Sequence, residues 1–209
     1  MNEEKIIAWA QQLMAVAQCG LTYNDDNPYE TERYHEIQKV ASEMIGEAAT
    51  ISQEAVLELF TDESKKGYAT PKVDSRGVVF NEEGKILLVK EHRTQKWTFP
   101  GGWVDVGDTP SGGVEREVWE ESGYKVKATK VLIVADRNLD YPPSHYHIYK
   151  LFFLCELNGG EATLSHETDG VGFFAEHDLP ELDINRTSVN HLARCFEFYR
   201  NPDMPTEFD

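Results

Sequence analysis

Residues 101–124 read GGWVDVGDTPSGGVEREVWEESGY, and this stretch carries most of the information in the chain. Thr109 and Pro110 are typical of the start of a helix, as the N-cap and the first helical residue. Gly123 suits the left-handed conformation that commonly follows the last turn. The stretch therefore predicts a helix over residues 110–122, preceded by a glycine-rich loop.

Three glutamates share one face of this predicted helix. Glu117, Glu120 and Glu121 stand at positions i, i+3 and i+4, a spacing that brings their Cβ atoms to about 5–6 Å. Carboxylates this close repel one another unless a cation is bound, and their oxygens are ligands that Mg²⁺ or Mn²⁺ prefers. Arg116 can turn its guanidinium back and hold them in place. A solvated acidic helix face is the alternative, and the helix pattern alone favours neither.

The flanking residues resemble the sequence box of the Nudix hydrolase family. The residues that match this box without insertion are Gly102, Arg116, Glu117, Val118, Glu120, Glu121, Gly123 and Tyr124. Asp108 departs from the box, because it stands where the family has a glutamate and carries its carboxylate on a shorter stem. Agreement at so many fixed offsets is a specific signal. The resemblance extends over residues 73–182 and implies a mixed α/β fold, the Nudix α/β/α sandwich with a mixed sheet.

The resemblance also implies a reaction, which is hydrolysis of the diphosphate in a small nucleoside-diphosphate derivative of the CDP-choline or ADP-ribose type. Glu117, Glu120 and Glu121, with the carbonyl of Gly101, are the implied ligands of Mg²⁺, with Mn²⁺ as a possible substitute. Such an ion would neutralise charge on the phosphate oxygens and acidify a bound water. For the general base, Glu167 and the glutamates Glu120 or Glu121 remain alternatives.

Four residues outside the helix are candidates for substrate binding. Arg76 lies on the first predicted strand. Arg137 lies just before a proline-containing loop, and Tyr141 lies at the start of that loop. These side chains could contact phosphate, sugar or base. Trp103 follows the glycine pair and could stack on a base, although a buried aromatic is the alternative.

The N-terminal part of the chain has helical periodicity. The apolar residues that define the first helical face are Ile6, Trp9, Ala10, Leu13, Val16 and Ala17. This helix is expected to end near Gly20, a second follows over residues 34–45, and a shorter third is expected after Ser52. We therefore expect a helical arm over residues 1–66 and a Nudix domain over 67–209. Because some sixty residues make a thin core, we expect the arm to pack on something larger or on a second copy, and a homodimer is the assembly that we expect.

Short β-branched and aromatic runs follow the arm. They predict strands over residues 73–80, 85–90, 126–135, 148–157 and 171–175, with a hairpin turn over residues 81–84 and a further helix over 188–199.

Composition limits the class of partner. The chain has 209 residues, with 20 lysines and arginines against 37 aspartates and glutamates, which gives a net charge of −17. Such a charge repels phosphodiester backbones and anionic lipids, so we expect neither a stable nucleic-acid complex nor a membrane partner. Three cysteines without metal-site spacing, and no secretion signal at the start, favour a cytoplasmic protein. An enzyme acting on RNA ends and a non-catalytic nucleotide sensor remain as alternative functions.

Overall fold

The chain folds into two compact units. The computed structural model describes residues 3–24, 27–49, 69–105, 107–142, 144 and 146–209. We call Met1–Lys72 with Pro143–His147 the helical unit, and Val73–Pro142 with Ile148–Asp209 the sandwich unit. The predicted third helix after Ser52 and the predicted boundary between residues 66 and 67 lie outside the described residues.

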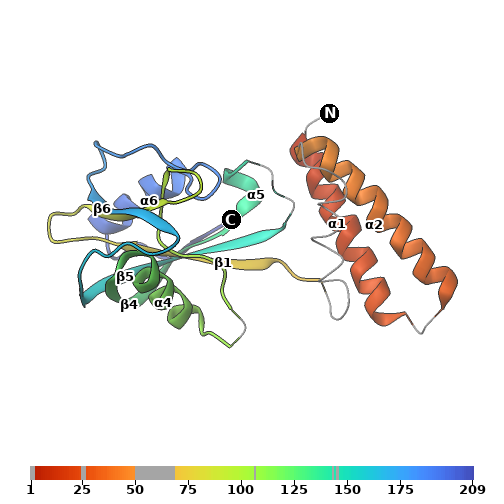
Figure 1. Cartoon of the computed structure of the whole chain (residues 1–209), viewed down its shortest axis with the longest axis horizontal. Helices are drawn as coiled ribbons and strands as arrows, with labels where there is room; N and C mark the ends of the chain where they lie inside the picture. Colours follow the sequence, from red (N-terminus) through yellow and green to blue (C-terminus); the bar gives the residue numbers. More distant parts are fainter. Residues whose placement is uncertain (1–2, 25–26, 50–68, 106, 143, 145) are drawn as a thin grey trace. The chain divides into compact units, whose positions relative to one another are not determined.

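The helical unit contains two long helices that lie side by side, α1 (Glu3–Tyr23) and α2 (Pro28–Ala49) (Figure 1). Their shared core consists of Ala10, Met14, Ala41 and Ile45. The prediction that α1 ends near Gly20 is wrong. The helix continues to Tyr23, and Gly20 lies against the ring of Tyr34, where a Cβ atom would come within 2.3 Å of ring carbons. The glycine therefore serves close packing inside the helix.

The predicted apolar face of α1 is only partly correct. Ala10 and Ala17 are buried, but Trp9, Leu13 and Val16 are exposed by 49%, 37% and 58%. The face that meets α2 is completed by other residues, and Trp9, Leu13 and Val16 form a second apolar stripe at helical spacing. The spacing of the apolar residues did not distinguish the buried face of α1, which meets α2, from the exposed stripe beside it.

The sandwich unit contains two sheets. The first has the strand order β1-β5-β4-β7 and the second the order β3-β2-β6. The strands are β1 (Lys72–Val79), β2 (Ile86–Glu91), β3 (Trp97–Thr98), β4 (Tyr124–Asp136), β5 (Ile148–Gly160), β6 (Thr168–Phe174) and β7 (Glu207–Phe208). β4 pairs antiparallel with β5 and parallel with β7, so the first sheet is mixed.

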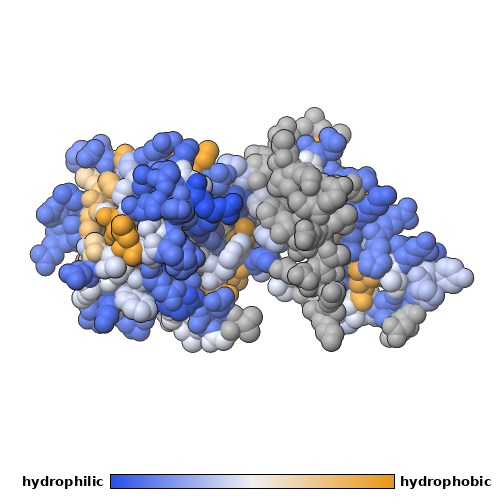
Figure 2. All heavy atoms as spheres, in the orientation of Figure 1, coloured by the Kyte–Doolittle hydropathy of each residue, from blue (hydrophilic) through white to orange (hydrophobic). Residues whose placement is uncertain are grey.

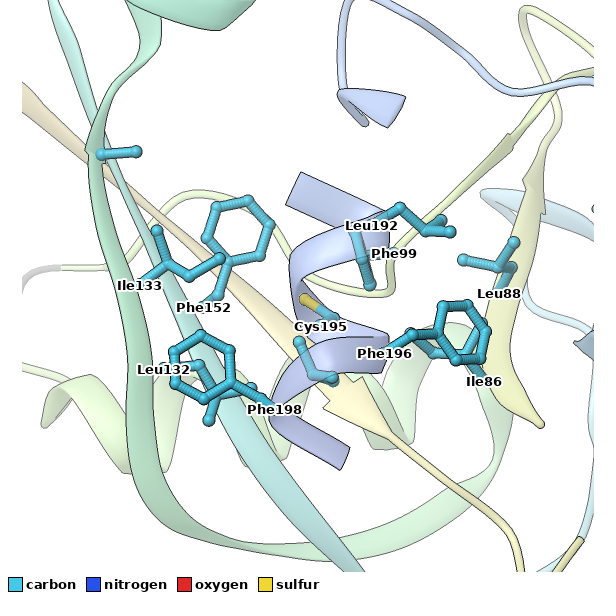
Figure 3. Packing of buried hydrophobic residues seen from close by; sticks show 12 residues of the cluster. Ile86, Leu88, Phe99, Leu132, Ile133, Phe152, Leu192, Cys195, Phe196 and Phe198 are labelled. Carbon is cyan, nitrogen blue, oxygen red and sulfur yellow. The ribbon is translucent and has the colours of Figure 1, made fainter. Parts of the chain in front are cut away.

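Two helices cover opposite faces of these strands. Val79 of β1 and Phe153 of β5 pack with Val118 of α4 (Pro110–Ser122). The residues next to them in sequence point the other way and pack on α6 (Val189–Arg200), in the cluster of Figure 3. Alternation of side chains along a strand explains why one run of apolar residues serves both faces. The predicted α/β/α sandwich is confirmed.

The predicted elements within the described residues are present, but α2 begins six residues earlier than expected, β5 ends three residues later and β6 begins three residues earlier. β3, β7 and the single-turn helix α5 (Arg137–Asp140) were not predicted. The turn over residues 81–84 is present, since the amide of Asn81 bonds the carbonyl of Lys85, but β1 and β2 belong to different sheets. The predicted hairpin turn is confirmed, because Phe80 and Ile86 form an antiparallel bridge directly across it.

The hydrophilic surface agrees with the high content of charged residues, and the cysteines form no disulfide among the described residues. Hydrophilic residues cover most of the visible face of the sandwich unit in Figure 2. Cys19, Cys155 and Cys195 are all free thiols. Among the described helices, none combines the length and the apolar character that crossing a bilayer requires.

Candidate active site

The helix α4 has the ends that its sequence predicts. The Oγ1 atom of Thr109 accepts the amide of Gly112 at 3.1 Å, and Gly123 closes the helix at a φ of 78°. A Cβ atom on Gly112 would lie 2.8 Å from Thr109 Oγ1, so this glycine leaves room for the cap. The predicted bounds of residues 110–122 are confirmed.

Two of the three glutamates lie in a cleft. Glu121 is 5% exposed, and its Oε2 atom accepts the amide of Gly101 at 2.8 Å. Glu117 lies against Gly102, where a Cβ atom would come within 3.2 Å of Oε2. Gly102 therefore lies close to the carboxylate of Glu117. Gly101, in contrast, is required by its φ of 134° and by the carbonyl oxygen of Ser75, 2.1 Å from where a Cβ atom would stand. Glu120 is more exposed and does not line this cleft.

Arg116 forms ion pairs with the carboxylates around it. Its Nη1 atom lies 2.9 Å from both Glu117 and Glu120, and its Nη2 atom lies 2.9 Å from Asp108. Asp105 lies further away, at 3.4 Å. Asp108, which departs from the family pattern, thus pairs with the arginine that orients the glutamates.

The two cleft carboxylates hold their protons more tightly than ordinary glutamates do, although Arg116 pairs with Glu117. Burial raises the pKa of Glu121 to about 8, and burial also raises the pKa of Glu117 above its ordinary value. Among the described residues, no three His, Cys, Asp or Glu side chains gather closely enough to form a metal site by themselves. The donor set nevertheless fits a hard divalent cation, because two carboxylates are held together in a desolvated place where a cation would offset their repulsion.

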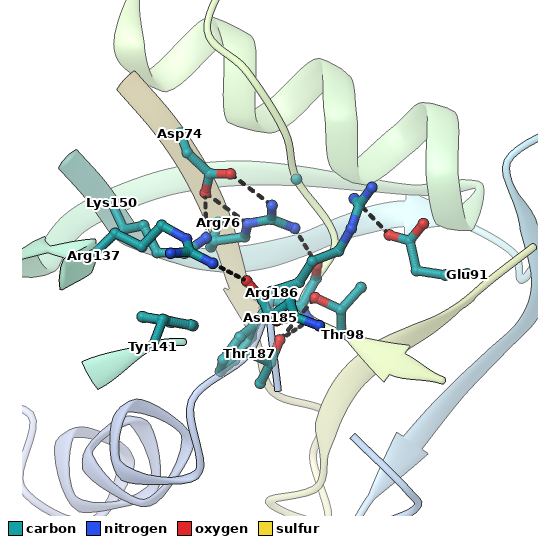
Figure 4. Close-up of polar contacts among 12 residues, drawn as sticks. Asp74, Arg76, Glu91, Thr98, Arg137, Tyr141, Lys150, Asn185, Arg186 and Thr187 are labelled. Atoms are coloured by element: carbon teal, nitrogen blue, oxygen red, sulfur yellow. Dashed lines mark hydrogen bonds and ion pairs between the residues drawn. The ribbon is translucent and has the colours of Figure 1, made fainter. Parts of the chain in front are cut away.

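The cleft has a volume of about 410 Å³ and lies within the sandwich unit. Glu117, Glu121 and Glu167 contribute carboxylates to its lining. The cleft also has a basic group, shown side by side in Figure 4 and made of Arg76, Arg137, Lys150 and Arg186. A site with carboxylates and cations in the same lining suits a ligand that carries anionic groups together with a metal ion.

Part of the basic group is fixed by a buried carboxylate. Asp74 accepts from Arg76 Nη2 at 2.7 Å and from Lys150 Nζ at 2.9 Å. Although burial opposes it, these two cations lower the pKa of Asp74 to about 2. Burial and the charge of Arg76 together lower the pKa of Lys150 to about 7, against the pull of Asp74. Arg76 and Lys150 therefore share one carboxylate beside the cleft, which fixes both side chains in place.

Comparison with known proteins agrees with this geometry. Residues 70–195, more than half of the chain, match the family model described as the NUDIX domain. The chain belongs to the Nudix hydrolase family. Its reaction is therefore hydrolysis of a diphosphate bond. Residues 4–60 match a second model, described as a UDP-X-like, N-terminal oligomerisation domain.

Three relatives resemble this Nudix hydrolase over much of its length. A putative ADP-ribose pyrophosphatase of Bacillus subtilis is 38% identical over 208 residues, covering 99% of this chain and 98% of the relative. The crystal structure of an ADP-ribose pyrophosphatase from Streptococcus suis has a TM-score of 0.62 at 40% identity, covering 67% of this chain and 100% of the other. The crystal structure of a UDP-X diphosphatase has a TM-score of 0.63 at 28% identity, covering 100% and 99%.

The structure places the other candidate residues of this Nudix hydrolase in different surroundings. Trp103 lines the cleft and is 46% exposed, so it is not a buried aromatic. Arg137 lines the cleft, and its guanidinium donates to the carbonyls of Pro142 and Asn185. Tyr141 is buried and does not line the cleft.

Tyr141 instead supports the basic group. Its hydroxyl lies 3.1 Å from Nδ1 of His191, and its ring lies 5.2 Å from Lys150 Nζ and 5.5 Å from the guanidinium carbon of Arg137. An aromatic face this close to two cations stabilises them in a buried place.

Glu167 lies in the loop between β5 and β6 and lines the cleft. Its side chain is 60% exposed, and its carbonyl accepts the amide of His92 at 2.8 Å. The next residue, Thr168, donates its hydroxyl to the carbonyl of Glu121 at 2.9 Å. The loop is therefore tied to the end of α4, and a water-accessible carboxylate lines the same cleft as Glu117 and Glu121.

Three cleft residues escaped the sequence analysis. Lys150 shares a face of β5 with Ile148 and Phe152, and a lysine within such an apolar alternation is a signal that could have identified it. Asp74, two residues before Arg76 on β1, offered a similar signal. Arg186 lies in an irregular loop, where neither periodicity nor a motif marks it.

Proposed function

We propose that this protein is a Mg²⁺-dependent pyrophosphohydrolase for a small nucleoside-diphosphate derivative, with ADP-ribose as the leading substrate type. The observation that supports this most is the cleft itself, where the half-buried Glu117, the buried Glu121 and four cations share one lining. A volume of about 410 Å³ suits a small molecule. Two of the relatives are named ADP-ribose pyrophosphatases and a third is named a UDP-X diphosphatase, which favours sugar-linked diphosphates.

In this proposal, Glu117, Glu120 and Glu121 hold the divalent ion. Glu120 is included because it shares their helix face, although its carboxylate here pairs with Arg116 at 2.9 Å. When bound, the ion supplies positive charge to the diphosphate oxygens and acidifies water. Arg116 and Asp108 keep the carboxylates oriented, and the basic group draws the anionic substrate into an otherwise acidic protein. Trp103 stacks on the base at the exposed side of the cleft.

Glu167 is our candidate for the general base that accepts the proton of the attacking water. Its carboxylate is accessible to water, and its loop is tied to the end of α4. We expect Glu167→Gln to lower kcat by about 10²- to 10⁴-fold, the usual contribution of a general base, with KM nearly unchanged. An unchanged kcat would show that Glu167 is not the general base and would leave Glu120 or Glu121 as the candidates.

We further propose that the chain forms a cytoplasmic homodimer through the helical unit. The exposed stripe of Trp9, Leu13 and Val16 on α1 supports the dimer, because apolar side chains of this size gain most when a partner covers them. The match of this part of the chain to an oligomerisation domain points the same way. The three free thiols support a reducing compartment.

A substrate panel tests the proposed activity. Purified protein with Mg²⁺ is given ADP-ribose, UDP-glucose, CDP-choline and 5′-triphosphorylated RNA, and release of nucleoside monophosphate or pyrophosphate is followed. We expect turnover of ADP-ribose, and loss of that turnover in Glu117→Gln, Glu120→Gln and Glu121→Gln. Glu83→Gln is the matched control, because Glu83 pairs with Lys85 in an exposed turn away from the cleft. Exclusive turnover of RNA, or activity that survives all three substitutions, would contradict the proposal.

A further inference from the structure

Arg186 is a cleft cation that keeps donors available for a ligand. It lines the cleft, and its side chain is 41% exposed. Its Nη1 atom lies 2.8 Å from Oε1 of Glu91, as Figure 4 shows. Within the described part of the chain this is the one contact recorded for its guanidinium. A guanidinium has five N–H donors in a planar fork, so most of them remain for a group in the cleft.

The other cations of the basic group use their donors on the protein. Arg76 directs Nε and Nη2 at Asp74 and Nη1 at the carbonyl of Phe99. Arg137 donates through Nη1 and Nη2 to two backbone carbonyls. These two arginines add positive charge to the site, but among the described residues Arg76 already makes three hydrogen bonds to the protein and Arg137 two, against one for Arg186. Arg186 is therefore better suited to direct contact with a substrate.

The loop that carries Arg186 is firmly built. The amide of Asp183 bonds the carbonyl of Trp97 at 2.8 Å, and the amide of Arg186 bonds the carbonyl of Asp183 at 2.9 Å. The hydroxyl of Thr187 lies 2.7 Å from that of Thr98, deep in the protein. The backbone of Arg186 is thus fixed on both sides before any ligand arrives. Such pre-organisation lowers the entropy lost on binding.

Glu91 fixes the direction of the arginine side chain. It stands at the end of β2, and its side chain is 8% exposed. Burying a carboxylate is costly unless it is paired, so Glu91 and Arg186 stabilise each other. The pair uses Nη1 of a guanidinium that lines the cleft, so Nε and Nη2 remain as donors for a ligand.

We propose that Arg186 binds a phosphoryl oxygen of the nucleoside diphosphate, and that Glu91 is the positioning residue that aims it. A planar guanidinium matches the paired oxygens of a phosphoryl group, which an ammonium group does not. This inference rests on the proposed function, since it assigns the substrate's diphosphate to a particular side chain.

The test compares Arg186→Gln and Arg186→Lys with wild type. Steady-state kinetics use whichever diphosphate of the panel is turned over, and calorimetry measures the Kd of its non-hydrolysable α,β-methylene analogue. We expect Arg186→Gln to raise KM and Kd by about tenfold to a hundredfold, the worth of a charged hydrogen bond. Arg186→Lys keeps the charge and should recover only part of this loss. Arg200→Gln is the matched control, because Arg200 pairs with Glu176 on the exposed surface.

A double-mutant cycle tests the role of Glu91. Glu91→Gln alone should raise KM with little change in kcat, and it should add almost nothing when Arg186 is already glutamine. Independent effects of the two substitutions would overturn the positioning role, because a merely structural residue would act alike in both backgrounds.

Two outcomes separate this inference from the proposed function. If wild type turns over none of the diphosphates, both fail. If wild type is active while Arg186→Gln matches Arg200→Gln in KM and in Kd, the proposed function stands and the role of Arg186 is wrong. Thermal unfolding of each variant confirms that the comparison is made between folded proteins.

Discussion

Glu121 connects the chemistry of the cleft to the stability of the metal-free protein. Burial raises its pKa from 4.5 to about 8, so the folded state holds its proton more tightly than the unfolded state does. The associated stability is fully present below pH 4.5 and is lost as the pH rises through about 8. A metal ion bound at high pH would offset this loss.

We therefore expect Glu121→Gln to stabilise the metal-free protein at pH 8 while it abolishes turnover. Glutamine keeps the acceptor for the Gly101 amide and removes the buried charge. The gain over wild type in EDTA should be on the order of 1–3 kcal/mol at pH 8 and much smaller at pH 5. Denaturant unfolding at the two pH values measures it. An equal difference in unfolding free energy at both pH values, or a less stable variant at pH 8, would show that burial does not disfavour the charged form of Glu121.

The sequence predicted some residues of the site better than others. The spacing of Glu117 and Glu121 on one helix face is a local property, so it was readable without the fold. The pairing of Asp108 with Arg116 depends on how the preceding loop turns back on the helix. Arg186 reaches the cleft only because its loop is tied to Trp97 and Thr98. Hydrogen bonds between residues far apart in the sequence produce no repeating pattern from which they could be predicted.

At the scale of single elements, α4 depends on how it ends. Gly123 has a φ of 78°, and a Cβ atom there would lie 2.3 Å from the carbonyl oxygen of Glu161. Gly107 also has a positive φ, of 104°, but a Cβ atom there meets nothing within 4 Å. Substitution of Gly107 would therefore introduce backbone strain alone, whereas substitution of Gly123 would introduce backbone strain and a steric clash.

We expect Gly123→Ala to destabilise the protein by about 3 kcal/mol or more and Gly107→Ala by about 1–2 kcal/mol. The difference arises because only the first substitution forces the backbone of the β5–β6 loop to move. Chemical denaturation of both variants provides the comparison. Equal losses would mean that the loop gives way freely and that the end of α4 is less constrained than the structure indicates.

The elements themselves show which sequence signals are reliable. The helix over residues 110–122 has a cap, a proline at its start and a glycine after its end, and its bounds were predicted correctly. The end of α1 was not, because Gly20 makes room for Tyr34 rather than ending the helix. Strands β3 and β7 have two residues each, too few for any alternation to register.

For the whole molecule, the apolar stripe on α1 predicts assembly. We expect Trp9→Glu to convert a homodimer into a monomer at micromolar concentration, because a charge would then have to be buried in the interface. Leu164→Glu is the matched control, since Leu164 is 60% exposed in the sandwich unit and the substitution adds the same charge. Light scattering coupled to size exclusion measures the mass of the full chain. A wild-type monomer, or a Trp9→Glu dimer, would contradict the proposed interface.

The charge of the molecule and the charge of its cleft point to the same requirement. The chain has a net charge of −17, and the lining of its cleft carries five carboxylates beside four cations. An anionic substrate that enters such a lining needs further positive charge. The account therefore requires a divalent ion that balances Glu117 and Glu121.

Manganese binding measured by electron paramagnetic resonance tests this requirement directly. Titration of the full chain with Mn²⁺ should show saturable binding in wild type and in Glu83→Gln, and at least tenfold weaker binding in the Glu117→Gln, Glu121→Gln double variant. If the double variant binds Mn²⁺ as tightly as wild type does, the two carboxylates of α4 do not hold the ion, and the central claim is wrong.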